Sequence, residues 1–252
     1  MKIKLILIIF ICLSLTFCAS YQKKLQNQRE NDPRYQYNMG LFYLQNNNID
    51  KAIWHLNKSI SINPRYDVAL CSLGLAYSMK GELIKAEKYY KKTLQVNPAL
   101  IEVHNYLGII YHELGYLDKA EQEFITAISD DNYKSKHLPY FNLAKLRFEQ
   151  GNLEQALSFV NKSISRNSNM VMSHNLRGII QEKLGNYNQA ITSYQSALDI
   201  IKNDVTIQFN LAVAYFKNKQ YSEAKKIFLD IRERIEDPQK REQINKYLEI
   251  IG

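Results

Sequence analysis

Residues 67–100, DVALCSLGLAYSMKGELIKAEKYYKKTLQVNPAL, decide the fold of this chain. Apolar side chains recur at helical spacing on both sides of Gly81, and Pro98 stands where the second helix has to end, because proline cannot continue a helix. Gly74 in the first half and Ala86 in the second half are small enough for two helices to approach closely. The stretch therefore predicts two helices that pack against each other, with a turn at Gly81.

The same pattern repeats along most of the chain. Gly40, Gly74 and Gly108 lie 34 residues apart. A series of alanines follows with spacings of 34, 34, 36, 34 and 34 residues: Ala52, Ala86, Ala120, Ala156, Ala190 and Ala224. An apolar or tyrosine side chain stands three residues before and four residues after each alanine. One helix pair cannot bury its apolar faces alone, so the pairs must stack to complete a core.

These units resemble tetratricopeptide repeats, which are antiparallel helix pairs of 34 residues. The resemblance implies an all-α fold, a right-handed α-solenoid of six helix pairs, over residues 33–66, 67–100, 101–136, 137–170, 171–204 and 205–238. Residues 239–252 follow Pro238, and Ile244, Tyr247, Leu248 and Ile251 share one helical face there. We expect that segment to be a capping helix that covers the last pair.

The composition agrees with this fold and excludes others. The 252 residues include nine glycines and five prolines, and 46% are apolar, which argues against collagen-like sequence, loop-rich β-sandwiches and disorder. The three cysteines are Cys12, Cys18 and Cys71. Because the first two belong to the N-terminal segment, Cys71 has no intramolecular partner for a disulfide, and we expect it to be a small packing residue.

The sequence contains no pattern that indicates catalysis. His104 and His112 are eight residues apart, which does not match the spacing of a helical zinc pair. There is no phosphate-binding glycine loop, nucleophile elbow or carboxylate cluster in the sequence. The net charge of +8 is spread along the helices, which is compatible with weak attraction to anionic lipid headgroups or acidic cell-wall polymer. We therefore expect a protein that is not an enzyme and has no cofactor, metal, small-molecule substrate or nucleic-acid partner.

Residues 1–18, MKIKLILIIFICLSLTFC, are typical of an export signal. Lys2 and Lys4 precede an uncharged run from Leu5 to Phe17, which has the length of a signal-peptide core and is too short to span a bilayer. The last four residues resemble a bacterial lipobox, which implies lipidation of Cys18, although Phe17 departs from the small residue usual before the cysteine.

The segment after Cys18 bears on the destination of the protein. Ala19 at the following position resembles outer-membrane lipoproteins, so we expect an outer-membrane lipoprotein that faces the periplasm. Two alternatives remain, which are cleavage after Ser20 to give a soluble exported protein and an uncleaved N-terminal anchor. Residues 19–32 are polar without periodicity, which predicts a flexible tether.

In the repeat family, the first helices of the pairs line an inner wall that usually binds a partner segment. Projection of these helices predicts a partner groove made of Tyr37, Leu41, Leu75, Asn105, Ile109, Phe141, Asn142, Asn175, Ile179, Phe209 and Val213. Apolar side chains with scattered amides suit an extended or helical segment of another protein. The alternative is that these residues pack between adjacent pairs. A carboxylate clamp of the chaperone-binding kind is not matched, because Lys145 is the lone cation of the inner row.

The signal, the tether and the six repeats together are similar to the type IV pilus biogenesis and stability lipoproteins, the pilotin-like PilF/PilW/Tgl group. Residues 94–110, LQVNPALIEVHNYLGII, and the two extra residues between the third and fourth repeats carry this resemblance. It implies a protein that helps the secretin reach the outer membrane and form its multimer. A general envelope scaffold for peptidoglycan or outer-membrane assembly proteins is the alternative.

Overall fold

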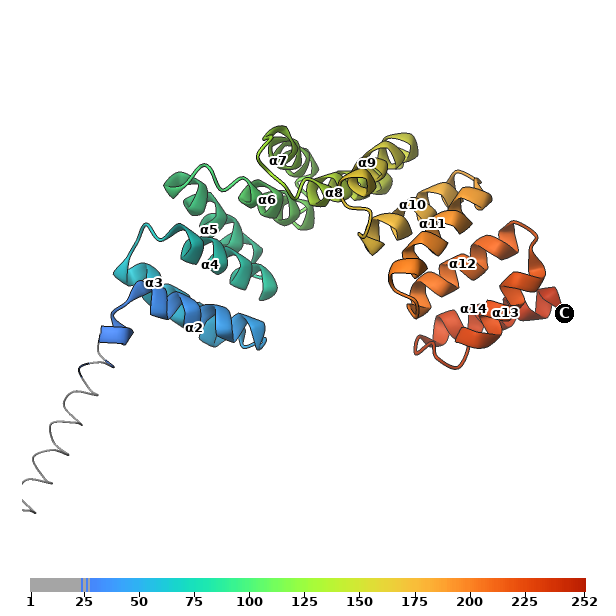
Figure 1. Ribbon diagram of the computed structural model, residues 1–252, viewed down its shortest axis with the longest axis horizontal. Helices are drawn as coiled ribbons and strands as arrows, with labels where there is room; N and C mark the ends of the chain where they lie inside the picture. Colours follow the sequence, from blue (N-terminus) through green and yellow to red (C-terminus); the bar gives the residue numbers. More distant parts are fainter. Residues whose placement is uncertain (1–23, 25, 27) are drawn as a thin grey trace, which may run out of the picture. The chain divides into compact units, whose positions relative to one another are not determined.

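A computed structural model describes residues 24, 26 and 28–252 (Figure 1). All regular secondary structure in this described part is helical, which confirms the predicted all-α class. The chain divides into two compact units, of which the first ends at Leu114 and the second begins at Gly115. The division falls between the two helices of the third predicted repeat.

The first unit contains two complete helix pairs and the first helix of the third pair. Its helices are α2 (Pro33–Gln45), α3 (Ile49–Ile62), α4 (Asp67–Met79), α5 (Leu83–Val96) and α6 (Glu102–Glu113). Helix α3 packs on α2 and on the following α4, and α5 packs on α4 and on the following α6. Each second helix therefore joins its own pair to the next one, as the stacking argument requires.

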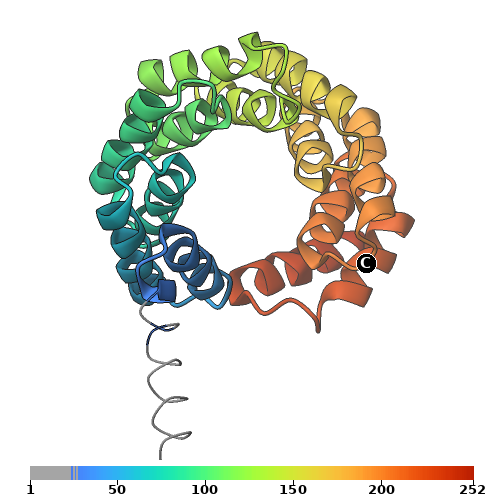
Figure 2. The same ribbon diagram turned by 60° about the vertical axis from the view of Figure 1, so that its left-hand side comes forward.

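The second unit continues the same alternation. Its helices are α7 (Leu117–Ser129), α8 (His137–Glu149), α9 (Leu153–Arg166), α10 (Val171–Lys183), α11 (Tyr187–Ile200), α12 (Val205–Lys217), α13 (Tyr221–Ile231) and α14 (Pro238–Ile251). First helices of consecutive pairs also touch each other directly, as α8 with α10 and α10 with α12 do here and α2 with α4 does in the first unit. Within each unit the first helices thus form one row and the second helices another (Figure 2).

Close helix contact explains the small residues of the pattern. A Cβ atom built on Gly40 would lie 2.6 Å from Cγ of Leu56, and one on Gly74 would lie 2.6 Å from the ring of Tyr90. The Gly178 position is equally tight against Tyr194. Such distances are far below the roughly 3.5–4.0 Å of a normal carbon contact, so a side chain does not fit there without movement of the neighbour.

A second set of glycines lies at the turns inside the pairs, seven residues after the small residue of each first helix. Gly81, Gly115, Gly151 and Gly185 all have φ angles between 77° and 79°. This left-handed conformation is costly for residues with a Cβ atom. Asn47 and Lys219 adopt it in the first and last pairs, with φ of 53° and 61°. The predicted turn at Gly81 is confirmed.

Helix α14 covers the last pair, as predicted, and starts one residue earlier, at Pro238. Proline suits this position because its missing N–H would be unpaired in the first turn. Ile244 is fully buried, and the ring of Tyr247 stacks on Phe228 with centroids 5.1 Å apart. The apolar face read from the sequence is thus the face that packs on α13.

The predicted signal segment 1–18, Cys18 included, lies outside the described residues, as does half of the predicted tether 19–32. The described end of the tether differs from the expectation, because residues 28–30 are helical and the Gln36 side chain donates to the carbonyl of Glu30 at 2.8 Å. The buried apolar side chains of the described residues lie between Leu44 and Ile244, so a chain that starts at Gln28 keeps all of them. Within the described residues, no helix combines the length and the apolar content that a membrane span requires.

Candidate functional site

The first helices of unit 1 carry five of the predicted groove residues. Leu75 on α4 is 43% exposed, and it is the one that solvent reaches most freely. Tyr37 and Leu41 on α2 are half-buried beside the core, and Tyr37 meets Tyr66 edge to face at 5.5 Å. On α6, Ile109 is half-buried, whereas Asn105 is only 2% exposed.

The first helices of unit 2 carry the other six. Phe141 and Asn142 on α8 and Asn175 and Ile179 on α10 are half-buried. The amide of Asn210 on α12 donates to the side-chain oxygen of Asn175 at 3.1 Å, which ties the two first helices together. Phe209 and Val213 on α12 are buried, at 9% and 8% exposure.

Burial therefore separates the predicted residues into two groups. Asn105, Phe209 and Val213 are packing residues in this structure, which is the alternative that the sequence left open. The reason is clearest for Phe209, whose ring lies 6.2 Å from that of Phe228 in the core that α14 closes. The other eight keep part of their surface in solvent.

The structure also exposes apolar side chains that the sequence projection missed. Phe42 on α2 is 53% exposed and Met79 on α4 is 49% exposed. Phe42 occupies the same place in its repeat as Ala76 does in the next, and Ala76 is fully buried. Residues at this place are covered by the preceding pair, and α2 begins the first pair. The sequence could have predicted the exposure of Phe42, because this residue belongs to the first repeat and no pair precedes it.

Two titratable side chains of unit 1, Cys71 on α4 and His55 on α3, have shifted pKa values. Burial raises the pKa of the Cys71 thiol to about 12, and the nearby carboxylates of Glu102 and Asp67 act in the same direction. Burial also lowers the pKa of His55, whose Nδ1 lies 2.7 Å from the side-chain oxygen of Gln36. No group of three His, Cys, Asp or Glu residues within 28–252 is close enough to hold a metal ion.

Comparisons with known proteins agree with this geometry. Tetratricopeptide-repeat models match residues 33–66, 68–100 and 101–129. The chain carries tetratricopeptide repeats. The C-terminal ARM domain of tetratricopeptide repeat protein 21, another helical array, matches residues 127–244. The sequence matches no curated protein.

Solved tetratricopeptide-repeat structures share the fold over most of the chain. PilF from Pseudomonas aeruginosa is 19% identical with a TM-score of 0.76, over 87% of this chain and 99% of PilF. PilW, a type IV pilus biogenesis factor, is 12% identical with a TM-score of 0.76, over 84% of this chain and 97% of PilW. A chain of the APC/C Cut9–Hcn1 hetero-tetramer is 17% identical with a TM-score of 0.75, over 90% of this chain and 45% of the APC/C chain. At these identities the likeness concerns the fold alone.

Proposed function

We propose that this protein is an exported, non-enzymatic adaptor that binds a segment of another protein on the face of its first helices. We propose further that this binding assists type IV pilus biogenesis. The observation that carries the proposal is the pair of exposed apolar side chains on the first helix α4 of unit 1, Leu75 and Met79. Apolar side chains left in water on a folded surface are typical of a protein interaction site.

The chemistry of this face suggests the kind of segment that it binds. Leu75 and Met79 offer contacts to aliphatic or aromatic side chains, and the thioether of Met79 adapts to different shapes. In unit 2, Phe141 on α8 and Ile179 on α10 are half-buried and offer the same kind of apolar contact. Each unit thus presents its own part of a peptide-binding surface.

The pilus role is supported by the extent of the structural likeness. PilF and PilW are each covered almost completely by this chain, at 99% and 97% of their length, whereas only 45% of the APC/C chain is covered. We infer that the partner is the outer-membrane secretin, and that the protein aids secretin localisation and multimerisation. In this proposal a lipid on Cys18 holds the protein at the periplasmic side of the outer membrane.

Capture of the secretin by the purified protein tests the partner. We expect Leu75→Glu to lower secretin capture at least tenfold, because a carboxylate would be buried against an apolar partner surface. Leu229→Glu is the matched control, since Leu229 is 49% exposed on the second helix α13 and undergoes the same chemical change. Equal capture by the wild type and by Leu75→Glu would refute the binding face.

The identity of the captured protein separates the two candidate functions. Peptidoglycan or outer-membrane assembly proteins in place of the secretin would favour a general envelope scaffold.

Replacement of the predicted lipidation site tests the membrane part separately. We expect Cys18→Ala to lower the amount of secretin multimer in cells while the circular dichroism of the purified protein stays unchanged, because the repeats do not include this residue. Mass spectrometry of the mature N-terminus distinguishes an acylated Cys18 from an unmodified chain that starts at Tyr21. Normal multimer levels and surface pili in the Cys18→Ala strain would contradict delivery by a lipid anchor.

A further inference from the structure

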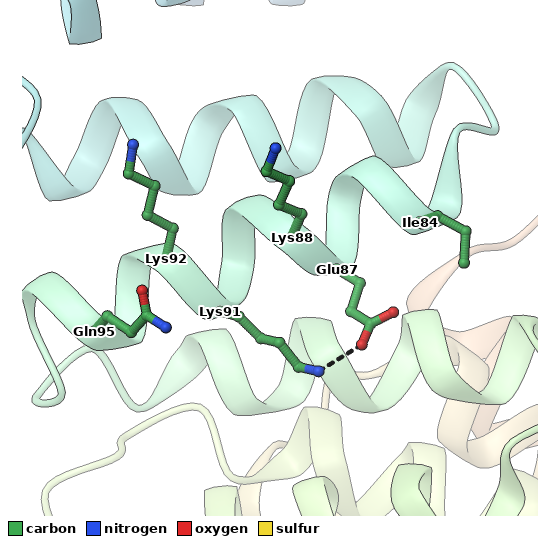
Figure 3. A pocket seen from close by; sticks show the side chains of 6 residues that line it. All are labelled: Ile84, Glu87, Lys88, Lys91, Lys92 and Gln95. Atoms are coloured by element: carbon green, nitrogen blue, oxygen red, sulfur yellow. Dashed lines mark hydrogen bonds and ion pairs between the residues drawn. The ribbon is translucent and has the colours of Figure 1, made fainter.

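The exposed side of α5 carries two lysines that have no ion-pair partner among the described residues. A hollow of about 470 Å³ lies along this helix and is lined by Ile84, Glu87, Lys88, Lys91, Lys92 and Gln95 (Figure 3). Lys91 pairs with Glu87 at 2.6 Å, whereas Lys88 and Lys92 point together to the other side of the helix. No carboxylate of residues 28–252 lies within ion-pair distance of these two lysines.

The spacing of Lys88 and Lys92 makes their lack of a partner significant. Like charges four residues apart on a helix repel and destabilise it by a few tenths of a kcal/mol. Two such lysines beside an open hollow would gain from an anionic partner that takes up both charges.

The neighbouring helix α3 extends this surface. Trp54 and Lys58 hold the same places in the first repeat that Lys88 and Lys92 hold in the second, 34 residues later. Helices α3 and α5 are linked directly, since the hydroxyl of Tyr89 on α5 donates to the side-chain oxygen of Asn57 on α3 at 3.4 Å. We call Trp54, Lys58, Lys88 and Lys92 the outer basic face.

This face combines charge with exposed apolar groups. Trp54 is 57% exposed and Ile84 is 64% exposed. Lys58 holds its ammonium 5.2 Å from the ring of Trp54. Tryptophan beside lysine is typical of side chains at the boundary between a membrane and water, where the ring sits at the level of the lipid headgroups.

The second unit lacks the same combination. Its residues at the equivalent places are Gln122, Thr126, Ser158, Lys162, Thr192, Ser196, Lys226 and Asp230. These eight side chains carry two positive charges and one negative charge. The four side chains of the outer basic face carry three positive charges, of which Lys58 has a carboxylate oxygen of Glu30 at 3.9 Å. The basic character therefore belongs to the repeats nearest the N-terminal segment.

We propose that the outer basic face binds the surface of a bilayer that contains anionic lipids. The sequence argues for a lipid surface rather than an acidic protein, because the apolar run ends at Phe17 and the first repeat begins soon after it, at Pro33. Even a fully extended chain between these two residues reaches at most about 58 Å, so an anchored N-terminus keeps unit 1 near the membrane. This choice of partner rests on the export and anchoring proposed above.

Vesicle binding by residues 28–252 tests the proposal without the N-terminal segment. Trp54 is the single tryptophan of the chain, so its fluorescence reports on this face alone. With vesicles of phosphatidylcholine and phosphatidylglycerol mixed two to one, we expect a blue shift of the emission and protection from acrylamide quenching, both lost at high salt. Vesicles of phosphatidylcholine alone should give neither effect.

Matched charge variants locate the binding. We expect Lys88→Gln with Lys92→Gln to lower the partition coefficient to the anionic vesicles about twentyfold, since each lysine at such a surface contributes independently. Lys183→Gln with Lys226→Gln removes the same charge from unit 2 and should change the coefficient less than twofold. Circular dichroism of both variants checks that the helices are intact.

Several outcomes would overturn the membrane face. These are no dependence on phosphatidylglycerol, equal losses in the two double variants, or vesicle binding with unchanged tryptophan emission. A tryptophan response to polyglutamate without any response to vesicles would indicate an acidic protein partner instead. The fragment lacks Cys18, so the vesicle assay does not depend on lipidation. If the fragment binds anionic vesicles but Cys18→Ala has no effect in cells, the lipid anchor is rejected and the outer basic face is retained.

Discussion

Replacement of Gly178 by alanine tests the packing logic of the repeats most directly. Alanine is the better helix former by about 1 kcal/mol, so helix propensity alone would make this variant more stable. The structure indicates the opposite, because the added Cβ atom would lie 2.4 Å from Cε1 of Tyr194 and 2.6 Å from its Cδ1. A normal carbon contact would require the ring to retreat by about 1 Å.

The ring of Tyr194 has little freedom to retreat. It is fully buried, and its hydroxyl donates to the carboxylate of Glu182 at 3.2 Å. Overpacking of a close-packed interior costs about 1–3 kcal/mol. Because the ring is rigid and its hydroxyl is held by a hydrogen bond, we expect a cost of about 3 kcal/mol here. After the gain in helix propensity, we expect Gly178→Ala to lower the free energy of unfolding by about 2 kcal/mol.

Urea denaturation of residues 28–252, followed by far-ultraviolet circular dichroism, measures this loss. Because repeat arrays can unfold in parts, amide hydrogen exchange in α10 and α11 should show the same change locally. Tyr194→Val supplies a double-mutant cycle, since Ala144 and Val160 pair in this way in the fourth repeat. With the ring gone, the clash of about 3 kcal/mol disappears and the gain in helix propensity remains, so we expect the loss in the double variant to be about 3 kcal/mol smaller than the sum of the two single losses.

The reverse change is the control. Ala144→Gly should lower the free energy of unfolding by about 1–2 kcal/mol, through lost helix propensity and a lost buried methyl group. A Gly178→Ala variant that is as stable as the wild type, or more stable, would refute the close-contact explanation of the glycines. If the losses of the Gly178→Ala and Tyr194→Val variants simply added in the double variant, the ring of Tyr194 would not be the cause of the clash.

Three further predictions concern single sites. Lys219→Gly should raise the free energy of unfolding by about 0.5 kcal/mol in urea titrations, because glycine relieves the left-handed φ of 61°. Glu121→Ala should lower it by about 2 kcal/mol, because the side chain of Arg147, only 17% exposed, loses its carboxylate partner. Cys71, with a pKa raised to about 12, should react with a thiol reagent at pH 8 far more slowly than free cysteine, as absorbance shows.

Each of these predictions has its own control. Glu242→Ala breaks an ion pair whose two side chains are each about two-thirds exposed and should leave the urea midpoint unchanged. If Glu121→Ala and Glu242→Ala lowered the free energy of unfolding by similar amounts, burial of Arg147 would not explain the effect at Glu121. Reaction of Cys71 should reach the rate of free cysteine in urea-unfolded protein. A fast reaction in the folded chain, or a destabilised Lys219→Gly variant, would contradict the corresponding local structure.

Much of the fold can be predicted from the sequence because its determinants are local and recur at a fixed period. Gly74 and Gly178 mark where paired helices touch, Gly81 marks a left-handed turn, and Ile244 marks the buried stripe of the capping helix. Each of these requirements concerns residues that lie close in the sequence or in the next helix. The pattern therefore specifies the helix pairs before any tertiary contact is known.

The exposure of the first-helix residues was decided by the tertiary structure. Val213 holds the same place in its repeat as Leu75, and Asn105 and Phe209 belong to the neighbouring row of the predicted groove, yet these three are buried and Leu75 is not. Phe42 lies outside that projection and is exposed. The physical reason is that exposure depends on which neighbouring helix covers a side chain, and that neighbour differs at the ends of an array and from one repeat to the next.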